Sequence, residues 1–170
     1  MRAVLDTNVL VSAALAQRDE RRGLARWVVE VALIGQRRFE HVTSDLLLNE
    51  LQRVLSRPGM LDAERAARFV DKILDVSTLI RVRGIAVGVR DPDDDKVVET
   101  AMNGDVDFVV SEDADLHDVS ARRAIAKVGI GIRARPIRVI TLRELVAEIE
   151  GTPRFSPLIA AELLPATLAA

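Results

Sequence analysis

The chain has 170 residues, a formal net charge of −2, 49% apolar and 29% charged residues, and no cysteine. This length and composition predict one globular domain with a substantial core, and the lack of cysteine excludes disulfide frameworks, thiolate metal sites and cysteine nucleophiles. Because no run of 18 apolar residues occurs and no basic N-terminal region precedes a long apolar segment, we expect neither a membrane span nor secretion, and predict a cytoplasmic protein.

Apolar runs that end on turn or capping residues predict five strands in chain order. They cover residues 3–5, 39–42, 79–82, 108–110 and 137–140. Between and after them, helical spacing of apolar residues predicts helices. These cover residues 9–16, 24–34, 45–55, 62–75, 95–103, 119–127 and 142–149, with residues 129–131 expected to form a loop.

Capping signals fix two of the predicted helix starts. Ser44 precedes the helix over 45–55, and Thr141 with Glu144 has the spacing of a capping box. Strands that alternate with helices indicate an α/β fold. We therefore predict a three-layer sandwich, with a central parallel sheet and helices on both faces. Residues 151–170 are expected to form an extension outside this core.

Charge is distributed unevenly along the chain, although its sum is close to zero. Residues 90–118 are rich in Asp and Glu, whereas residues 119–143 carry Arg and Lys and no acidic residue. A solvated charged face is one interpretation of this basic segment. The other is that it binds the phosphate backbone of RNA, because phosphate contacts from Lys and Arg dominate such binding. The residues with this second role would be Arg122, Arg123, Lys127, Arg133 and Arg135.

Acidic residues stand at the ends of predicted elements that a parallel sheet would bring together. Asp6 follows the first strand, and Asp113 follows the fourth. Asp95 opens a predicted helix that carries Glu99 one turn later, and Glu50 flanks the apolar stripe of another helix. In an open parallel sheet, ligands bind at the carboxyl ends of the strands. We therefore expect these carboxylates to converge on one site.

A cluster of this kind has an energetic consequence. Two like charges about 4 Å apart repel by roughly 4 kcal/mol at an effective dielectric constant of about 20. Clustered carboxylates must therefore take up protons or bind cations. Oxygen ligands without His or Cys favour Mg²⁺ or Mn²⁺. Such ions, when some of their coordination positions stay open for water and substrate, can activate water to hydrolyse a phosphodiester bond.

Four segments, in this order, resemble the PIN-domain family, and in particular the bacterial PilT N-terminus-like proteins that are putative toxins of toxin–antitoxin pairs. The third is the most specific, since it joins an acidic loop, an acidic helix and a strand that closes on Ser-x-Asp-x-Asp. The segments are VLDTNVLVSAAL (4–15), SDLLLNELQRVL (44–55), DPDDDKVVETAMNGDVDFVVSEDADL (91–116) and PIRVITLREL (136–145).

This resemblance implies a metal-dependent endoribonuclease with a PIN-like nuclease domain over residues 1–150. Its acidic quartet, catalytic and metal-binding, falls on Asp6, Glu50, Asp95 and Asp113. Asp115 matches a further acidic position that binds metal in many members. The cofactor implied is Mg²⁺ or Mn²⁺, and the substrate is RNA.

Further residues are expected to support the quartet. Asn8 and Ser111 match polar positions that orient the carboxylates, and Ser111 keeps the hydroxyl of the Thr found in many members. Glu99 either assists with the metal or pairs with Lys96 or an arginine, and Lys96 itself is expected to be solvated. Three alternatives stay open, because Asp93, Asp94 or Asp115 could take the role given to a neighbour. The lone histidines, His41 and His117, receive no catalytic role.

The resemblance also suggests partners, namely a homodimer mate and a small antitoxin protein that covers the acidic site. One rival hypothesis is a non-catalytic module of the same fold that acts through a protein partner and needs no metal. A second rival is a phosphoryl-transfer or receiver-type domain, which also clusters Asp at strand ends. Against it, Asp6-Thr7-Asn8 lacks the second Asp of the phosphatase motif, and the last strands do not end on Lys.

Overall fold

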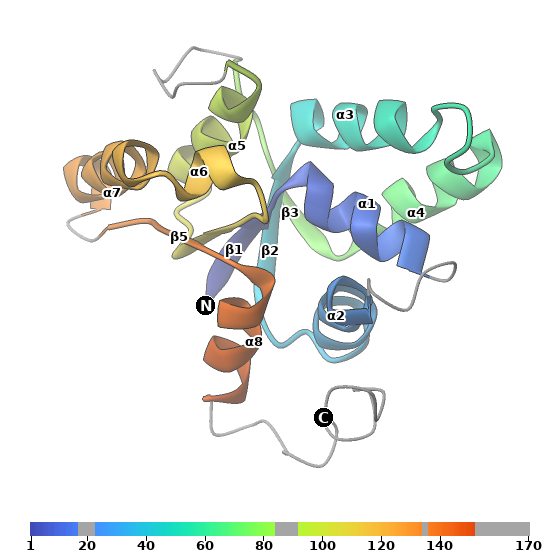
Figure 1. Ribbon diagram of the computed structural model, residues 1–170, viewed down its shortest axis with the longest axis horizontal. Coiled ribbons are helices and arrows are strands. Elements are labelled where there is room, and N and C mark those ends of the chain that lie inside the picture. The colour runs from blue at the N-terminus through green and yellow to red at the C-terminus, as the bar shows by residue number, and fades with distance from the viewer. Residues whose placement is uncertain (17–22, 84–91, 134–135, 152–170) are drawn as a thin grey trace.

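The protein is described by a computed structural model that covers residues 1–16, 23–83, 92–133 and 136–151 (Figure 1). Its centre is a sheet of five parallel strands in the order β3-β2-β1-β4-β5. The strands are β1 (Arg2–Leu5), β2 (Glu40–Ser44), β3 (Ser77–Ile80), β4 (Phe108–Val110) and β5 (Arg138–Ile140). The predicted parallel α/β architecture is confirmed, and the ends of each predicted strand lie within two residues of those in the structure.

Side chains alternate across the sheet and define two apolar cores. Leu5 on β1 and Val110 on β4 belong to the core on one face, whereas Val4 and Val109 belong to the core on the other. One layer of helices covers the first face of the sheet, and a second layer covers the other (Figure 1). The predicted three-layer arrangement is therefore present.

The helices of the first face agree well with the predicted ones. They are α1 (Thr7–Leu15), α2 (Gly23–Arg26) continued by a π-helical segment (Trp27–Gly35), α3 (Asp45–Leu55), α4 (Ala63–Asp75) and α8 (Leu142–Glu150). Ser44 Oγ accepts a hydrogen bond from the backbone N–H of Leu47, and the capping box of Thr141 and Glu144 is complete. The helix expected over 24–34 is instead a short α-helix and a π-helix.

The second face differs from the predictions in three ways. Its helices are α5 (Pro92–Asn103), α6 (Ala114–His117) and α7 (Val119–Arg133). Helix α5 begins at Pro92 rather than Asp95, because proline is favoured in the first turn, where its missing N–H costs nothing. Helix α6 was not predicted, and α7 continues through residues 129–131, which were expected to form a loop. Glycine inside a helix costs only about 1 kcal/mol, so Gly129 and Gly131 do not by themselves end α7.

One prediction cannot be followed in the structure. The C-terminal extension lies outside the described residues from residue 152 onward. Within the described part of the chain, no helix is both long enough and apolar enough to cross a membrane.

Candidate active site

The candidate site lies between β1 and β4, where the strand order of the sheet reverses. Strand β1 pairs with β2 on one side and with β4 on the other, and the connections from these neighbours lead to opposite edges of the sheet. In open parallel sheets, this switch point is where a crevice forms at the carboxyl ends of the strands. Asp6 directly follows β1, and Ser111 directly follows β4, so both residues stand at this place.

A hydrogen-bond network centred on Ser111 joins the two strand ends. Ser111 Oγ donates to Asp6 Oδ2 over 2.6 Å and accepts from Asn8 Nδ2 at 3.3 Å and from the backbone N–H of Asp113 at 3.0 Å. A hydroxyl has one proton and two lone pairs, so this set uses the full capacity of Ser111. Ser111 contacts the Asp6 carboxylate directly and Asn8 contacts Ser111, and the orienting roles of both residues stay predictions.

Asp6 is buried, with 8% of its surface exposed. Burial raises the pKa of its carboxyl above the ordinary value, because a charge is solvated less well inside the protein. The hydrogen bonds from Ser111 and from the Thr7 amide lower the pKa, whereas the carboxylates of Glu50 and Asp113 raise it. Asp6 is therefore a carboxylate whose charge the fold itself leaves only partly compensated.

Glu50 approaches the site from α3 and has partners on two other helices. Thr7 Oγ1 donates to Glu50 Oε2 over 2.8 Å, and Lys96 Nζ lies 2.7 Å from Glu50 Oε1. The side chains of Glu50 and Lys96 are only 16% and 18% exposed. The expectation that Lys96 is solvated is therefore wrong. Sequence spacing gives no signal for the contacts with Thr7 and Lys96, because they join residues more than forty positions apart.

The remaining acidic candidates divide into buried and exposed groups. Asp95 and Glu99 lie one turn apart on α5 and are buried, at 8% and 5% exposure. Glu99 Oε1 accepts a hydrogen bond from the backbone N–H of Arg83 over 2.8 Å. Asp113 and Asp115 are exposed at the start of α6, where Asp113 Oδ1 caps the helix by accepting from the Asp115 amide.

The described carboxylates do not form a preformed metal-binding cluster. Within the described residues, no group of three or more His, Cys, Asp or Glu side chains is placed to hold a metal ion. Asp6, Glu50 and Asp113 are nevertheless close enough for their charges to interact. The side chains of Asp93 and Asp94, the alternatives to Asp95, lie outside the described residues. The metal-binding roles of the quartet and of Asp115 stay predictions.

The donors at Asp6 suit a hydrated Mg²⁺ or Mn²⁺ ion. Asn8 Oδ1 is buried and has no hydrogen-bond partner among the described residues. Its orientation is set by Ser111, whose single proton goes to Asp6, so that Asn8 must present its NH₂ group to Ser111. An unsatisfied amide oxygen beside a buried carboxylate is compatible with a cation or its water. Mg²⁺ is usually held by one or two carboxylates and keeps several waters, so a full ligand cage is not required.

Four of the five predicted phosphate-binding residues, Arg122, Arg123, Lys127 and Arg133, belong to α7. Arg122, Arg123 and Lys127 are all exposed. The side chain of Arg133 and the whole of Arg135 lie outside the described residues.

One of these arginines is linked to the strand end. Arg122 Nη2 lies 2.5 Å from His117 Nδ1, and His117 Nε2 lies 2.7 Å from the carbonyl oxygen of Ser111. Because arginine can only donate, Nδ1 accepts and the proton is on Nε2. A chain of hydrogen bonds thus connects the basic helix to the end of β4.

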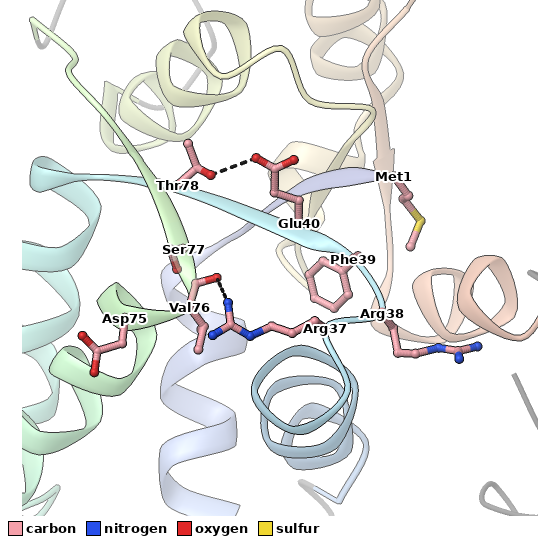
Figure 2. Close-up of a pocket in the computed structure, with 9 residues that line it drawn as sticks. All are labelled: Met1, Arg37, Arg38, Phe39, Glu40, Asp75, Val76, Ser77 and Thr78. Atoms are coloured by element: carbon pink, nitrogen blue, oxygen red, sulfur yellow. Dashed lines mark hydrogen bonds between the residues drawn. The ribbon is translucent and has the colours of Figure 1, made fainter. Parts of the chain in front are cut away.

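Two cavities lie away from the candidate carboxylates Asp6, Glu50, Asp95 and Asp113. The larger, of about 520 Å³, is at the amino ends of β2 and β3, opposite the edge that carries Asp6 (Figure 2). Arg37 bonds the carbonyl oxygen of Val76 there, and Thr78 bonds Glu40, as Figure 2 shows. The smaller, of about 230 Å³, is lined by residues of α7 and β5, including Arg122. We place the candidate site at Asp6 because charge and topology coincide there.

Comparison with known proteins gives a single result. A family model described as the PIN domain matches residues 2–115 and thus spans Asp6, Glu50, Asp95 and Asp113. No curated protein and no solved structure matches the chain. The parallel sheet and the position of Asp6 at its switch point agree with this match. The chain belongs to the PIN-domain family, whose members are typically metal-dependent nucleases.

Proposed function

We propose that this protein is an endoribonuclease that hydrolyses RNA phosphodiester bonds with the help of Mg²⁺ or Mn²⁺. The observation that carries the proposal is Asp6, a buried carboxylate at the switch point of the sheet whose charge is disfavoured by burial and by Glu50 and Asp113. A nearby divalent cation would offset this unfavourable charge. Family membership supports nuclease activity in general, and the choice of RNA and of the ion belongs to the proposal.

The residues around Asp6 have distinct tasks in this proposal. Asp6 holds the cation, and Asp113 and Asp95 contribute oxygen ligands or bind its waters. Ser111 and Asn8 fix the orientation of the Asp6 carboxylate through the hydrogen bonds described above. The cation, when bound, lowers the pKa of an attacking water and stabilises charge on the phosphate. Glu50 positions Thr7 and Lys96 at the edge of the site.

Substrate binding is assigned to the exposed basic residues of α7. Helix α6 joins the loop at Asp113 to α7. Arg122 on α7 is connected to the Ser111 carbonyl oxygen by hydrogen bonds through His117. Arginine and lysine at this position would neutralise RNA phosphates while the acidic site acts on a neighbouring bond. The described chain contains one tryptophan, which is buried, so base stacking on exposed tryptophan has no support there.

A toxin of a toxin–antitoxin pair is the biological role that we propose for this nuclease. It would act in the cytoplasm as a homodimer, and a small antitoxin would cover the acidic site. The support is the resemblance of the sequence to PilT N-terminus-like proteins. Expression of the chain should arrest growth of a bacterial host, and Asp6→Asn should abolish the arrest. Equal arrest by both proteins would contradict a nuclease-based toxin.

The direct test is cleavage of total RNA by the purified protein, with and without Mn²⁺. We expect fragments only with the ion, and none from the Asp6→Asn variant. Asp71→Asn is the matched control, because Asp71 is an exposed carboxylate on α4, away from the site. Metal-independent cleavage, or equal cleavage by Asp6→Asn, would contradict the proposal.

A non-catalytic PIN-fold module that acts through a protein partner is the second candidate. It is favoured by two observations, namely the pairing of Glu50 with Lys96 and the lack of a three-residue metal cluster among the described residues. In that case Mn²⁺ would neither produce RNA fragments nor raise the melting temperature. The RNA assay, together with a melting curve in Mn²⁺, therefore separates the two candidates.

A further inference from the structure

We propose that Lys96 is a built-in counter-cation of Glu50 that competes with divalent cations for the acidic site. Lys96 would thereby limit how tightly the site binds metal and keep Glu50 from acting as a ligand. This inference rests on the proposed metal-dependent function and deepens it. It concerns a residue that the sequence placed in solvent and that the structure places in contact with a predicted metal ligand.

The contacts of Glu50 leave neither of its carboxylate oxygens unengaged. Oε1 is 2.7 Å from Lys96 Nζ, and Oε2 accepts from Thr7 Oγ1 over 2.8 Å. Arg53 lies farther away, at 3.9 Å, and its side chain is 67% exposed. Because the Lys96 and Glu50 side chains are both more than four-fifths buried, water screens their attraction less than it screens a surface pair. Lys96 is therefore the main compensating charge of Glu50.

The packing of α5 against Ser44 and the sheet determines where Lys96 lies. Thr100, one turn beyond Lys96 on α5, places its Oγ1 2.8 Å from Ser44 Oγ and 2.7 Å from the Lys96 carbonyl oxygen. Ser44 caps α3, the helix that carries Glu50. At the end of α5, a Cβ on Gly104 would collide with Val42 of β2, so the helix lies close against the sheet. The geometry of the ion pair is thus determined by how α5 packs.

Electrostatics gives the consequence for a divalent ion. The Glu50 carboxylate acts on Asp6, since it raises the pKa of that carboxyl. The ammonium group of Lys96, which is paired with Glu50, reduces the negative potential at Asp6 and repels an approaching cation. If Lys96 were uncharged, Glu50 would keep its hydrogen bond to Thr7 and the more distant, exposed Arg53, and its carboxylate would attract the ion. The Lys96 charge and the ion would lie in the same partly buried site, where the effective dielectric constant is well below that of water. Removing the Lys96 charge should therefore tighten cation binding by about tenfold or more.

The test is a titration with Mn²⁺ in the absence of RNA, in which electron paramagnetic resonance measures the free ion. The key variant is Lys96→Met, which keeps a long apolar side chain and removes the charge. Lys96→Arg keeps the charge, and Lys72→Met removes an exposed lysine from α4 as the matched control. We expect Lys96→Met to bind Mn²⁺ about tenfold more tightly than the parent protein, or to take up an additional ion, while both other variants behave like the parent. Circular dichroism confirms that each variant is folded.

A second variant tests whether the effect passes through Glu50. Glu50→Gln in the Lys96→Met background should return the Mn²⁺ affinity to that of the parent or below it. If Lys96→Met binds Mn²⁺ no more tightly than the parent, or if no variant binds Mn²⁺, the inference is overturned. The binding readout separates this inference from the nuclease proposal. Tighter binding without RNA cleavage would support the inference alone, and cleavage with unchanged binding would support the nuclease alone.

Discussion

Ser111 donates a hydrogen bond to Asp6 over 2.6 Å, although the two residues are 105 positions apart in the chain. This bond joins the carboxyl ends of β1 and β4, the two strands between which the strand order reverses. It lowers the pKa of a carboxyl that burial raises, so it helps Asp6 to carry the charge that a cation needs. The same hydroxyl accepts from Asn8 and from the Asp113 amide and thus positions three site residues at once.

Ser111→Ala should therefore impair the site more than the loss of one hydroxyl would suggest. Asp6 would lose a buried hydrogen-bond donor, and the free energy of unfolding should fall by about 1–3 kcal/mol. Because groups that orient metal ligands are worth roughly 10–100-fold in metal affinity or activity, RNA cleavage should fall by about that factor. Urea unfolding and a cleavage assay in Mn²⁺ measure the two effects.

Ser111→Thr is the control for this prediction, because it keeps the hydroxyl. It should retain most of the activity, and its hydrogen bond to Asp6 should persist. Loss of activity by Ser111→Thr as large as that by Ser111→Ala would mean that the size of the side chain, and not its hydrogen bond, matters at this position.

Asp6→Asn should stabilise the protein in the absence of metal. The pKa of Asp6 is raised on folding, so the folded chain binds a proton more readily than the unfolded chain. Stability therefore falls as the pH rises through the pKa of the folded state, and a neutral Asn avoids this loss. At neutral pH and without metal, both the free energy of unfolding and the melting temperature of Asp6→Asn should therefore exceed those of the parent protein.

The pH dependence of this gain identifies its cause. It should be largest at neutral pH and should vanish in acid, where Asp6 itself is protonated. Asp113→Asn is the comparison, because Asp113 is exposed and should give little stabilisation at any pH. A lower melting temperature for Asp6→Asn than for the parent protein, without metal at neutral pH, would show that burial does not dominate at Asp6.

The fold could be predicted largely from local patterns. Short apolar runs and capping residues such as Ser44 and Thr141 have local physical causes, and these elements are present in the structure. The sequence predicts a start at Asp95 for α5, whereas the helix begins at Pro92, a residue that is favoured in a first helical turn. The glycines of α7 suggested a loop, since propensity ignores the packing energy of a long amphipathic helix.

The candidate site was only partly predictable. Asp6 and Ser111 could be placed together because a parallel sheet brings the ends of its strands to one edge. The pairing of Glu50 with Lys96 could not be found, since it depends on the angle and distance between α3 and α5, which tertiary packing sets. The neutral tautomer of His117 likewise depends on where Arg122 lies in space.

Arg123→Ala tests the assignment of RNA binding to α7. If Arg123 contacts a phosphate, its removal should weaken RNA binding and reduce the slope of log affinity against log salt by about 0.7, the value for one contact with a single strand. Binding is measured with Asp6→Asn protein, so that the RNA is not cut, over a range of KCl concentrations. Lys127→Ala should give a change of similar size.

The control for this prediction is Lys72→Ala, because Lys72 is exposed on a helix that covers the opposite face of the sheet. Its removal changes the net charge by the same amount as that of Arg123. If Lys72→Ala alters the salt dependence as much as Arg123→Ala does, the interaction reflects overall charge and not a surface on α7.

His41 should make the protein sensitive to mild acid. Its ring is fully buried on β2, and burial lowers its pKa to about 3. Ser77 Oγ donates to the carbonyl oxygen of Ile73, so it accepts from His41 Nδ1, and His41 Nε2 has no partner among the described residues. A second proton would therefore enter a site without an acceptor.

The sign of the effect follows from the two pKa values of His41. Between the ordinary value of 6.5 and about 3, the unfolded chain binds a proton that the folded chain does not. The free energy of unfolding should thus fall by about 1.4 kcal/mol for each pH unit below 6.5. His41→Asn keeps a donor for Ser77 and cannot titrate, so it should flatten this slope between pH 6.5 and 5, even though it lowers stability overall. Urea unfolding of both proteins across this range gives the slopes, and equal slopes would mean that His41 is charged in the folded protein or that other groups control the acid response.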